Sequence, residues 1–163
     1  MILLVMTDGR VDCLSRAIES ARENLCGEVT HKVIHDDTGD ESYREELRAT
    51  FPDFDVIGQP TRQGFGGAIR SAWAALSGRP ERFVFHLEDD FTFNAPIDLP
   101  PMQHVLDRCL AKDPAARYPQ VAELLADLRA IRLRLEASDA RPAAAARDST
   151  GPLTCRIERP PAP

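Results

Sequence analysis

Short apolar runs alternate with segments of helical periodicity along the first 91 residues of the chain. The apolar runs have the length and the β-branched or aromatic content of strands, and they cover 2–6, 28–35, 54–58 and 83–91. The segments between them space their apolar residues along one helical face, at 11–25, at 40–51, and after Gly67 with Ile69, Ala72, Trp73 and Leu76 inside. This alternation predicts an α/β fold with a Rossmann-like, mostly parallel sheet of about four strands, flanked by helices.

Each predicted strand ends in a polar or glycine-containing cluster. The clusters are Thr7-Asp8-Gly9-Arg10, Asp36-Asp37-Thr38-Gly39-Asp40, Thr61-Arg62-Gln63-Gly64-Phe65-Gly66-Gly67-Ala68 and Glu88-Asp89-Asp90. In a parallel sheet all these ends lie on one edge, where ligands of open α/β folds bind. Their convergence therefore predicts one polar ligand site.

The acidic cluster places three adjacent carboxylates, Glu88, Asp89 and Asp90, at the end of an apolar strand. Like charges repel, so a divalent cation, a basic neighbour or bulk water must compensate them. Oxygen ligands on a short turn suit Mg²⁺ or Mn²⁺, which in turn bind phosphate. A solvated acidic turn is the alternative, and the strand alone does not decide between the two.

The second cluster also allows two interpretations. Asp36 and Asp37 can accept hydrogen bonds from a base or a ribose hydroxyl. A helix N-cap region is the alternative, because Thr38, Asp40 and Ser42 suit that role, and the residues alone favour it.

The glycine-rich cluster opens a predicted helix. Gly64, Gly66 and Gly67 allow close backbone approach at a helix N-terminus, which is suited to anions. Arg62 can neutralise a phosphate there, although a single loop arginine is more often only solvated. The glycines lack the G-x-G-x-x-G spacing, so a dinucleotide-binding domain is a weaker alternative.

Composition limits the classes of partner. The chain has 163 residues, a net charge of -6 and a pI near 5.2, which fits one domain with an appendage and argues against non-specific binding to nucleic acid or to anionic membranes. No apolar segment reaches the length of a membrane span, and 1–6 lacks the features of a signal peptide. The four scattered cysteines contain no C-x-x-C pair, so a cytoplasmic location is expected.

Taken together, the four clusters give residues 1–99 a resemblance to the N-terminal, nucleotide-sugar-binding half of a GT-A glycosyltransferase of the family 2-like kind. The acidic cluster resembles the family's D-x-D motif, with Glu88 and Asp90 at its outer positions. The resemblance implies a UDP- or GDP-linked sugar donor, held through Mn²⁺ or Mg²⁺ on the acidic cluster. It also implies a base or ribose contact from Asp36 or Asp37, with the first loop (Thr7, Asp8 and Arg10) beside the nucleotide.

The same resemblance implies sugar transfer to an acceptor that the sequence does not identify. In the family, the general base and most acceptor contacts follow the acidic motif. No counterpart of that half is recognised in this chain, so no catalytic residue is assigned and donor binding is expected rather than full turnover. An inactive relic or a non-catalytic interaction module is the alternative. The predicted fourth strand then lies at an unprotected sheet edge, which invites homo-oligomers.

The pattern changes after residue 99. Helical periodicity at 102–111 and 122–135 predicts a helical hairpin over 100–136, with Pro100 and Pro101 as a break before it. The hairpin is expected to pack on the sheet and cap its exposed edge or face. Residues 137–163 are rich in Ala, Pro and Arg, which predicts a disordered tail.

The run from Leu106 to Pro119, followed by Ala122-Glu123-Leu124-Leu125, resembles the last two helices of bacterial serine/threonine protein kinase domains. This resemblance covers about 99–131 and implies a structural role for Arg117, paired with a glutamate of an activation segment that is not found here. The kinase glycine-rich loop, H-R-D and D-F-G motifs are also not found, so no kinase activity is expected. The combination indicates a chimera of two families.

Overall fold

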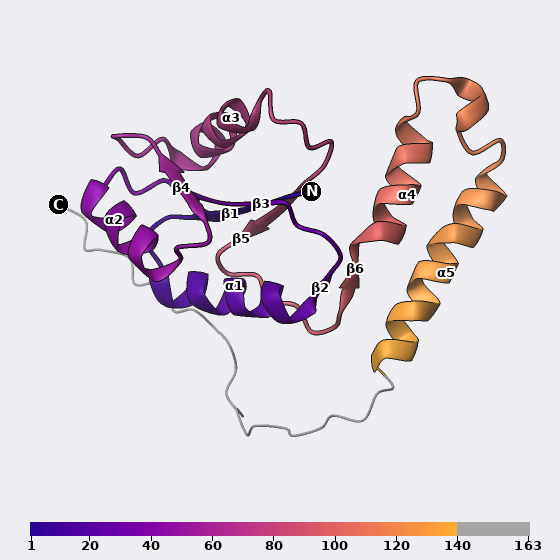
Figure 1. Cartoon of the computed structure of the whole chain (residues 1–163), viewed down its shortest axis with the longest axis horizontal. Helices are drawn as coiled ribbons and strands as arrows, with labels where there is room; N and C mark the ends of the chain where they lie inside the picture. The colour runs from indigo at the N-terminus through magenta and orange to yellow at the C-terminus, as the bar shows by residue number, and fades with distance from the viewer. Residues whose placement is uncertain (140–163) are drawn as a thin grey trace.

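A computed structural model describes residues 1–139 of the protein (Figure 1). Its main sheet consists of four parallel strands in the order β4-β3-β1-β5, with β1 at Ile2–Thr7, β3 at His31–Asp36, β4 at Asp55–Gly58 and β5 at Val84–Glu88. The predicted α/β fold with a mostly parallel, Rossmann-like sheet is therefore confirmed. The fourth strand is shorter than the predicted 83–91, since it ends at the first carboxylate of the acidic cluster.

Helices cover both faces of this sheet. Helices α1 (Val11–Asn24) and α2 (Glu41–Thr50) lie on one face, and α3 (Gly64–Leu76) lies on the other (Figure 1). Side chains alternate along β1, so that Leu3 and Val5 pack under α1 while Leu4 packs under α3. Every residue of β1 is buried, which makes it the centre of the core.

The buried face of α3 agrees with the prediction at Ile69, Ala72 and Leu76 but not at Trp73. Ala68, Ala72 and Leu76 contact the sheet, whereas the Trp73 side chain is 47% exposed. Trp73 lies about 100° around the helix from Ala72, which carries it past the face that meets the strands. The prediction that Trp73 is an inward-facing residue was wrong.

A second, two-stranded sheet was not predicted. β2 (Leu25–Cys26) pairs in parallel with β6 (Ile97–Asp98) and ties the segment after the acidic cluster to the end of α1. β6 leads directly into α4 (Leu99–Leu110). Pro100 and Pro101 lie in the first turn of α4 and do not break the chain before it. Proline fits there because first-turn amides have no intrahelical acceptor.

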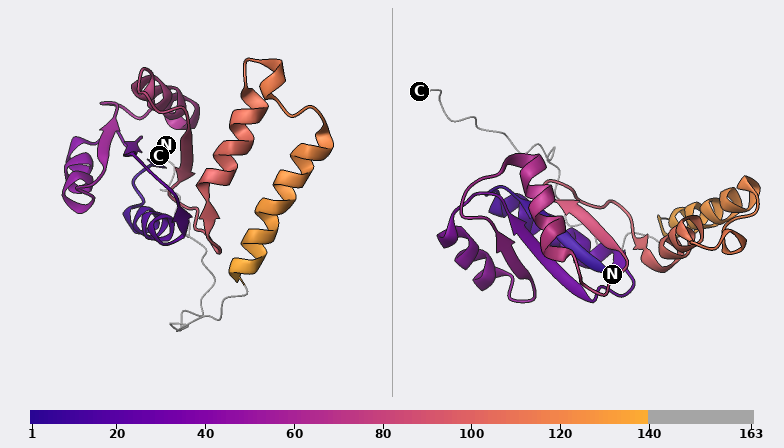
Figure 2. Two further views of the ribbon diagram at one scale, coloured as in Figure 1. Left: turned by 45° about the vertical axis from the view of Figure 1, so that its right-hand side comes forward. Right: turned by 90° about the horizontal axis from the view of Figure 1, so that it is seen from above.

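The predicted hairpin is formed by α4 and α5 (Val121–Asp139), joined through the short 3-10 helix η1 (Pro114–Ala116). Figure 2 shows both helices projecting beside the sheet, so they do not cap either of its faces as expected. Because α5 continues to Asp139, the predicted tail boundary at 137 is three residues too early; the rest of that prediction, 140–163, lies outside the described residues.

Strand β5 forms one edge of the main sheet, as predicted for the fourth strand, and pairs with no further strand within residues 1–139.

None of the helices in this part of the chain has the length and apolarity needed to cross a bilayer.

Candidate functional site

A pocket of about 160 Å³ lies where the carboxyl ends of the parallel strands meet the start of α3. It is lined by Met6 of β1 and by residues of all four predicted clusters: Thr7, Asp8, Arg10, Asp37, Arg62, Phe65, Ala68, Glu88 and Asp89. Strands β1, β3 and β5 end side by side, which brings residues up to 82 positions apart in the chain into hydrogen-bonding contact, such as Thr7 and Asp89. The clusters thus meet at one edge, as parallel pairing requires.

Arg10 is the basic neighbour of the acidic cluster. Its Nε donates to Asp8 Oδ1 at 2.9 Å, its Nη2 donates to Asp89 Oδ1, and its Nη1 lies 3.5 Å from Asp90 Oδ2. One guanidinium therefore holds carboxylates from two strand ends. The acidic cluster was expected to be compensated by a divalent cation, a basic neighbour or bulk water. Of these three, the side chains show a basic neighbour, Arg10.

Asp89 is an internal anchor of the site. Its side chain is 1% exposed, and its Oδ2 accepts a 2.8 Å hydrogen bond from Thr7 Oγ1 while Oδ1 is paired with Arg10. Burial raises the pKa of Asp89, although the Thr7 hydroxyl and the Arg10 charge act in the opposite direction. Both oxygens therefore have partners within the protein, and Asp89 also lines the pocket.

Glu88 and Asp90 are placed differently from Asp89. The Glu88 carboxylate lines the pocket and has no ion pair or side-chain hydrogen bond within 1–139, and Asp90 is 42% exposed with only its long contact to Arg10. No group of three or more His, Cys, Asp or Glu side chains in this part of the chain is arranged to hold a metal alone. Mg²⁺ is commonly held by one or two carboxylates together with substrate phosphates and water. Glu88 and Asp90 have oxygens available for that shared mode, whereas the Asp89 oxygens already pair with Thr7 and Arg10. The assignment of a metal to all three carboxylates stays a prediction.

Asp36 and Asp37 have separate environments despite being adjacent. Asp36 is 0% exposed; it accepts from Thr38 N at 2.9 Å and pairs with Arg44 Nη1 at 2.9 Å, so it does not line the pocket. Asp37 does line it, with Oδ1 accepting from Gln63 N at 2.7 Å and Oδ2 without a hydrogen bond among the described residues.

The helix-cap alternative for this cluster is confirmed at Asp40, one of the residues on which it was based. Asp40 caps α2, and its side chain accepts from Ser42 N at 2.9 Å. Asp37 is therefore the member of the pair with an oxygen available to a ligand, while Asp36 organises the loop behind it.

Arg62 reaches the pocket through a close approach of two loops. Its Nη2 pairs with Asp8 Oδ2 at 3.0 Å, and its side chain is 61% exposed. Gly39 makes the approach feasible: its φ is +78°, and a Cβ there would lie 2.8 Å from the Arg62 backbone nitrogen and 2.9 Å from Thr61 Cα. Gly39 was missed, and its signal is the Thr-Gly-Asp sequence between the strand end and the helix cap.

The three glycines of the third cluster are not among the residues that line the pocket. Gly64 and Gly66 face open space or a side-chain tip, and a Cβ on Gly67 would meet Gln63 Cβ at 2.6 Å, so Gly67 serves the packing of the helix start. Phe65, 65% exposed, lines the pocket instead. Its signal was an aromatic residue between glycines in a loop predicted to face a ligand.

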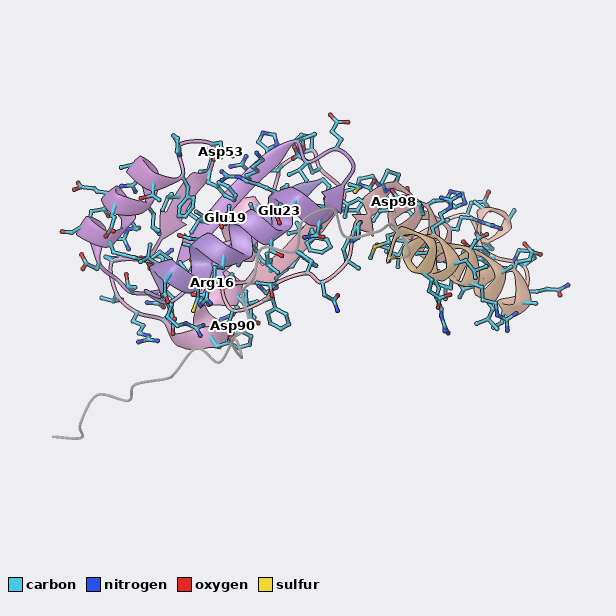
Figure 3. The ribbon with its side chains drawn as sticks, turned by 90° about the horizontal axis from the view of Figure 1, so that it is seen from below. Arg16, Glu19, Glu23, Asp53, Asp90 and Asp98 are labelled. Carbon is cyan, nitrogen blue, oxygen red and sulfur yellow. The ribbon has the colours of Figure 1, made fainter. Side chains whose placement is uncertain are left out.

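Figure 3 shows Asp90 and Asp98 in separate regions, with Asp98 beside the hairpin.

Comparison with family models and with curated proteins found no match for this chain. Both family resemblances and the implied chimera therefore stay predictions.

Proposed function

We propose that the pocket binds a nucleoside diphosphate sugar, and that the protein is a glycosyltransferase-like, nucleotide-sugar-dependent transferase in its donor half. The observation that carries the proposal is the meeting of an available Asp37 oxygen, the partly exposed Arg62 and the unpaired Glu88 carboxylate around one strand-end pocket, with the exposed Asp90 outside the lining and two residues further along the chain. Those are the groups needed for a base or ribose, for a phosphate and for a phosphate-bound cation, respectively.

Each side chain has a distinct role in this proposal. Asp37 Oδ2 accepts an N–H or O–H of the base or ribose, because its other oxygen is already fixed by Gln63 N. Arg62 turns from its exposed pair with Asp8 to a phosphate oxygen, since an exposed ion pair costs little to exchange. The exposed ring of Phe65 packs on the base.

The metal belongs to the same proposal. Glu88 and Asp90 would hold Mg²⁺ or Mn²⁺ jointly with the diphosphate, and the bound ion would stabilise negative charge on the leaving phosphate oxygen. Arg10 keeps Asp89 and the turn that carries Asp90 in place. The acceptor and the general base stay unassigned, so the proposal commits to donor binding as its first testable step. A cytoplasmic location and homo-oligomers through the β5 edge also stay proposals.

Calorimetry with UDP and GDP, with and without Mn²⁺, tests donor binding. The expected result is binding that requires the metal. Asp90→Ala is expected to abolish the metal-dependent part while circular dichroism and the melting temperature stay unchanged, because Asp90 is exposed and only weakly paired. Asp98→Ala is the matched control, since Asp98 is similarly exposed at 43% and lies beside the hairpin (Figure 3).

Three results separate the parts of the proposal. Failure of the folded protein to bind UDP or GDP in the presence of Mn²⁺ would refute donor binding. Undiminished binding by Asp90→Ala would refute the metal assignment alone. Binding of NAD without any ion would favour the dinucleotide-binding alternative instead.

A further inference from the structure

The hairpin of α4 and α5 carries an apolar surface that no described part of the chain covers. Six large aliphatic side chains are between 38% and 71% exposed: Met102, Leu106 and Leu110 on α4, and Val121, Leu125 and Leu128 on α5. Single exposed leucines are ordinary on protein surfaces, but a contiguous group of this size marks an interaction site.

These side chains lie on one broad face of the hairpin. The contact line between the helices follows Val105, which is 8% exposed, and Arg108, which pairs with Asp127 of α5 at 3.6 Å. Leu106 follows Val105 by one position, and Leu128 follows Asp127 by one, so each is turned about 100° in the same sense from the contact line. The helices run antiparallel (Figure 1), and equal turns on antiparallel helices point to the same side.

The opposite broad face holds a groove of about 420 Å³. Its lining mixes polar side chains of both helices (His104, Asp127 and Arg134) with small or medium-sized apolar ones (Pro100, Pro101, Val105, Ala130 and Ile131). Leu133, 64% exposed, is turned away from both the contact line and the aliphatic side chains. We call the face with the six aliphatic side chains the hairpin face.

Residue spacing indicates what kind of partner fits the hairpin face. Val121, Leu125 and Leu128 follow one another by four and then three positions, and Met102, Leu106 and the exposed Cys109 do the same. This alternation is the spacing of helices that pack against other helices at a shallow angle. Two helices alone cannot enclose such a seam, whereas two hairpins face to face can.

We propose that the hairpin face binds the hairpin face of a second copy of this chain, giving a two-fold symmetric four-helix bundle. Such an interface is isologous, so both copies bring the same aliphatic side chains and no separate complementary surface is needed.

The size of the face sets the strength of this dimer. Helix α4, at 12 residues, is about 18 Å long, and two helices side by side are about 20 Å wide, which gives a face of about 400 Å². Two such faces together bury about 800 Å², which is less than the roughly 1,200 Å² of standard specific interfaces and fits a weak, transient one. The expected dissociation constant is therefore micromolar rather than nanomolar.

Sedimentation velocity of the full chain across the micromolar range tests the proposal. A reversible monomer–dimer equilibrium is expected, and the double variant Leu106→Glu with Leu125→Glu is expected to raise the dissociation constant at least about tenfold, because it places charges in the apolar centre of the face. Leu133→Glu is the matched control: the same chemical change on the same hairpin, outside the face, is expected to leave the equilibrium unaltered.

Each other outcome overturns the proposal. A protein that stays monomeric throughout has no such interface. A dimer that survives the double change is formed elsewhere, for example at the β5 edge, and an equal loss in Leu133→Glu would show a non-specific effect. A monomer whose melting temperature falls in the double variant, but not in Leu133→Glu, would show that the chain itself covers the face.

Discussion

The buried pair of Asp36 and Arg44 makes the sharpest prediction about how the site is held. Their side chains are 0% and 6% exposed and meet at 2.9 Å, and Arg44 also donates to the Gln59 carbonyl at 3.1 Å. Arg44→Leu removes the only cationic partner of Asp36 recorded in the described part of the chain. Breaking a buried pair from one side costs about 3–5 kcal/mol. The two hydrogen bonds from Thr38 remain, so we expect a loss near the lower limit, about 3 kcal/mol of unfolding free energy.

Urea unfolding followed by circular dichroism measures this loss, with an unchanged m-value as the check for two-state behaviour. Arg48→Leu is the control: Arg48 pairs with the same α2 residue as Arg44, Glu41, at 2.8 Å, but it is 46% exposed, so its loss should stay below about 1 kcal/mol. Adding Asp36→Asn to Arg44→Leu should recover part of the stability, since the uncompensated charge is then gone. If the two leucine variants lost equal, small amounts, the pair would not hold the loop as reasoned.

Three further predictions concern the site and its support. Arg10→Gln leaves Asp89 buried without its cation, and thermal melting should show that the free energy of unfolding falls by about 2 kcal/mol. This loss is smaller than for a fully buried pair because the Arg10 side chain is 36% exposed. An unchanged melting temperature would contradict the role of Arg10 in holding Asp89. Burial lowers the pKa of His35 from 6.5, so the unfolded state binds a proton more readily than the folded state. The free energy of unfolding should therefore fall as the pH drops below about 6.5, by at most about 1.4 kcal/mol per pH unit. Urea unfolding at several pH values should show this slope in the native protein and a shallower one in His35→Gln. Gly39→Ala should weaken UDP or GDP binding and lower the free energy of unfolding by about 1–3 kcal/mol. Gly64→Ala, also at positive φ but in open space, should lower it less. Equal losses in the two variants would mean that backbone strain alone matters, and not the close approach of the Arg62 loop.

The alternation of short apolar runs and helical stripes was enough to predict the main sheet, because parallel strands buried on both faces need continuous apolar runs. The first strand was predicted within one residue, at 2–6 against Ile2–Thr7. The pairing of β2 with β6 was not predictable, since a two-residue strand has no periodicity. The position of the hairpin beside the sheet could not be predicted from the sequence either, because apolar spacing identifies the apolar face of a helix but not the surface that packs against it.

Within the site, sequence located the clusters but not the role of each member. Asp36 and Asp37 are identical in type and adjacent, and only the fold shows that one is sealed against Arg44 while the other faces the pocket. Arg44 itself resembled any charged residue of an exposed helix. Its burial follows from Gly58, where a Cβ would meet the Asp36 carbonyl at 2.6 Å and Arg44 Nη1 at 3.2 Å, so a glycine in the third predicted strand makes room for the guanidinium.

Charge compensation connects these observations to the proposed ligand. Arg44 pairs with Asp36 in the protein interior, and Arg10 pairs with Asp89, so each arginine compensates one buried carboxylate. Asp37, Glu88 and Asp90 keep oxygens without strong partners, and negative charge left this way favours whatever cation or hydrogen-bond donor enters the pocket. A bare diphosphate would be repelled by these carboxylates, so the charge balance supports the metal requirement that we propose. Without the metal, Arg62 is the cation of the pocket that is free to turn to a phosphate, since Arg10 is paired with the buried Asp89. Nucleotide should therefore bind more weakly without Mn²⁺ than with it, and should raise the melting temperature less.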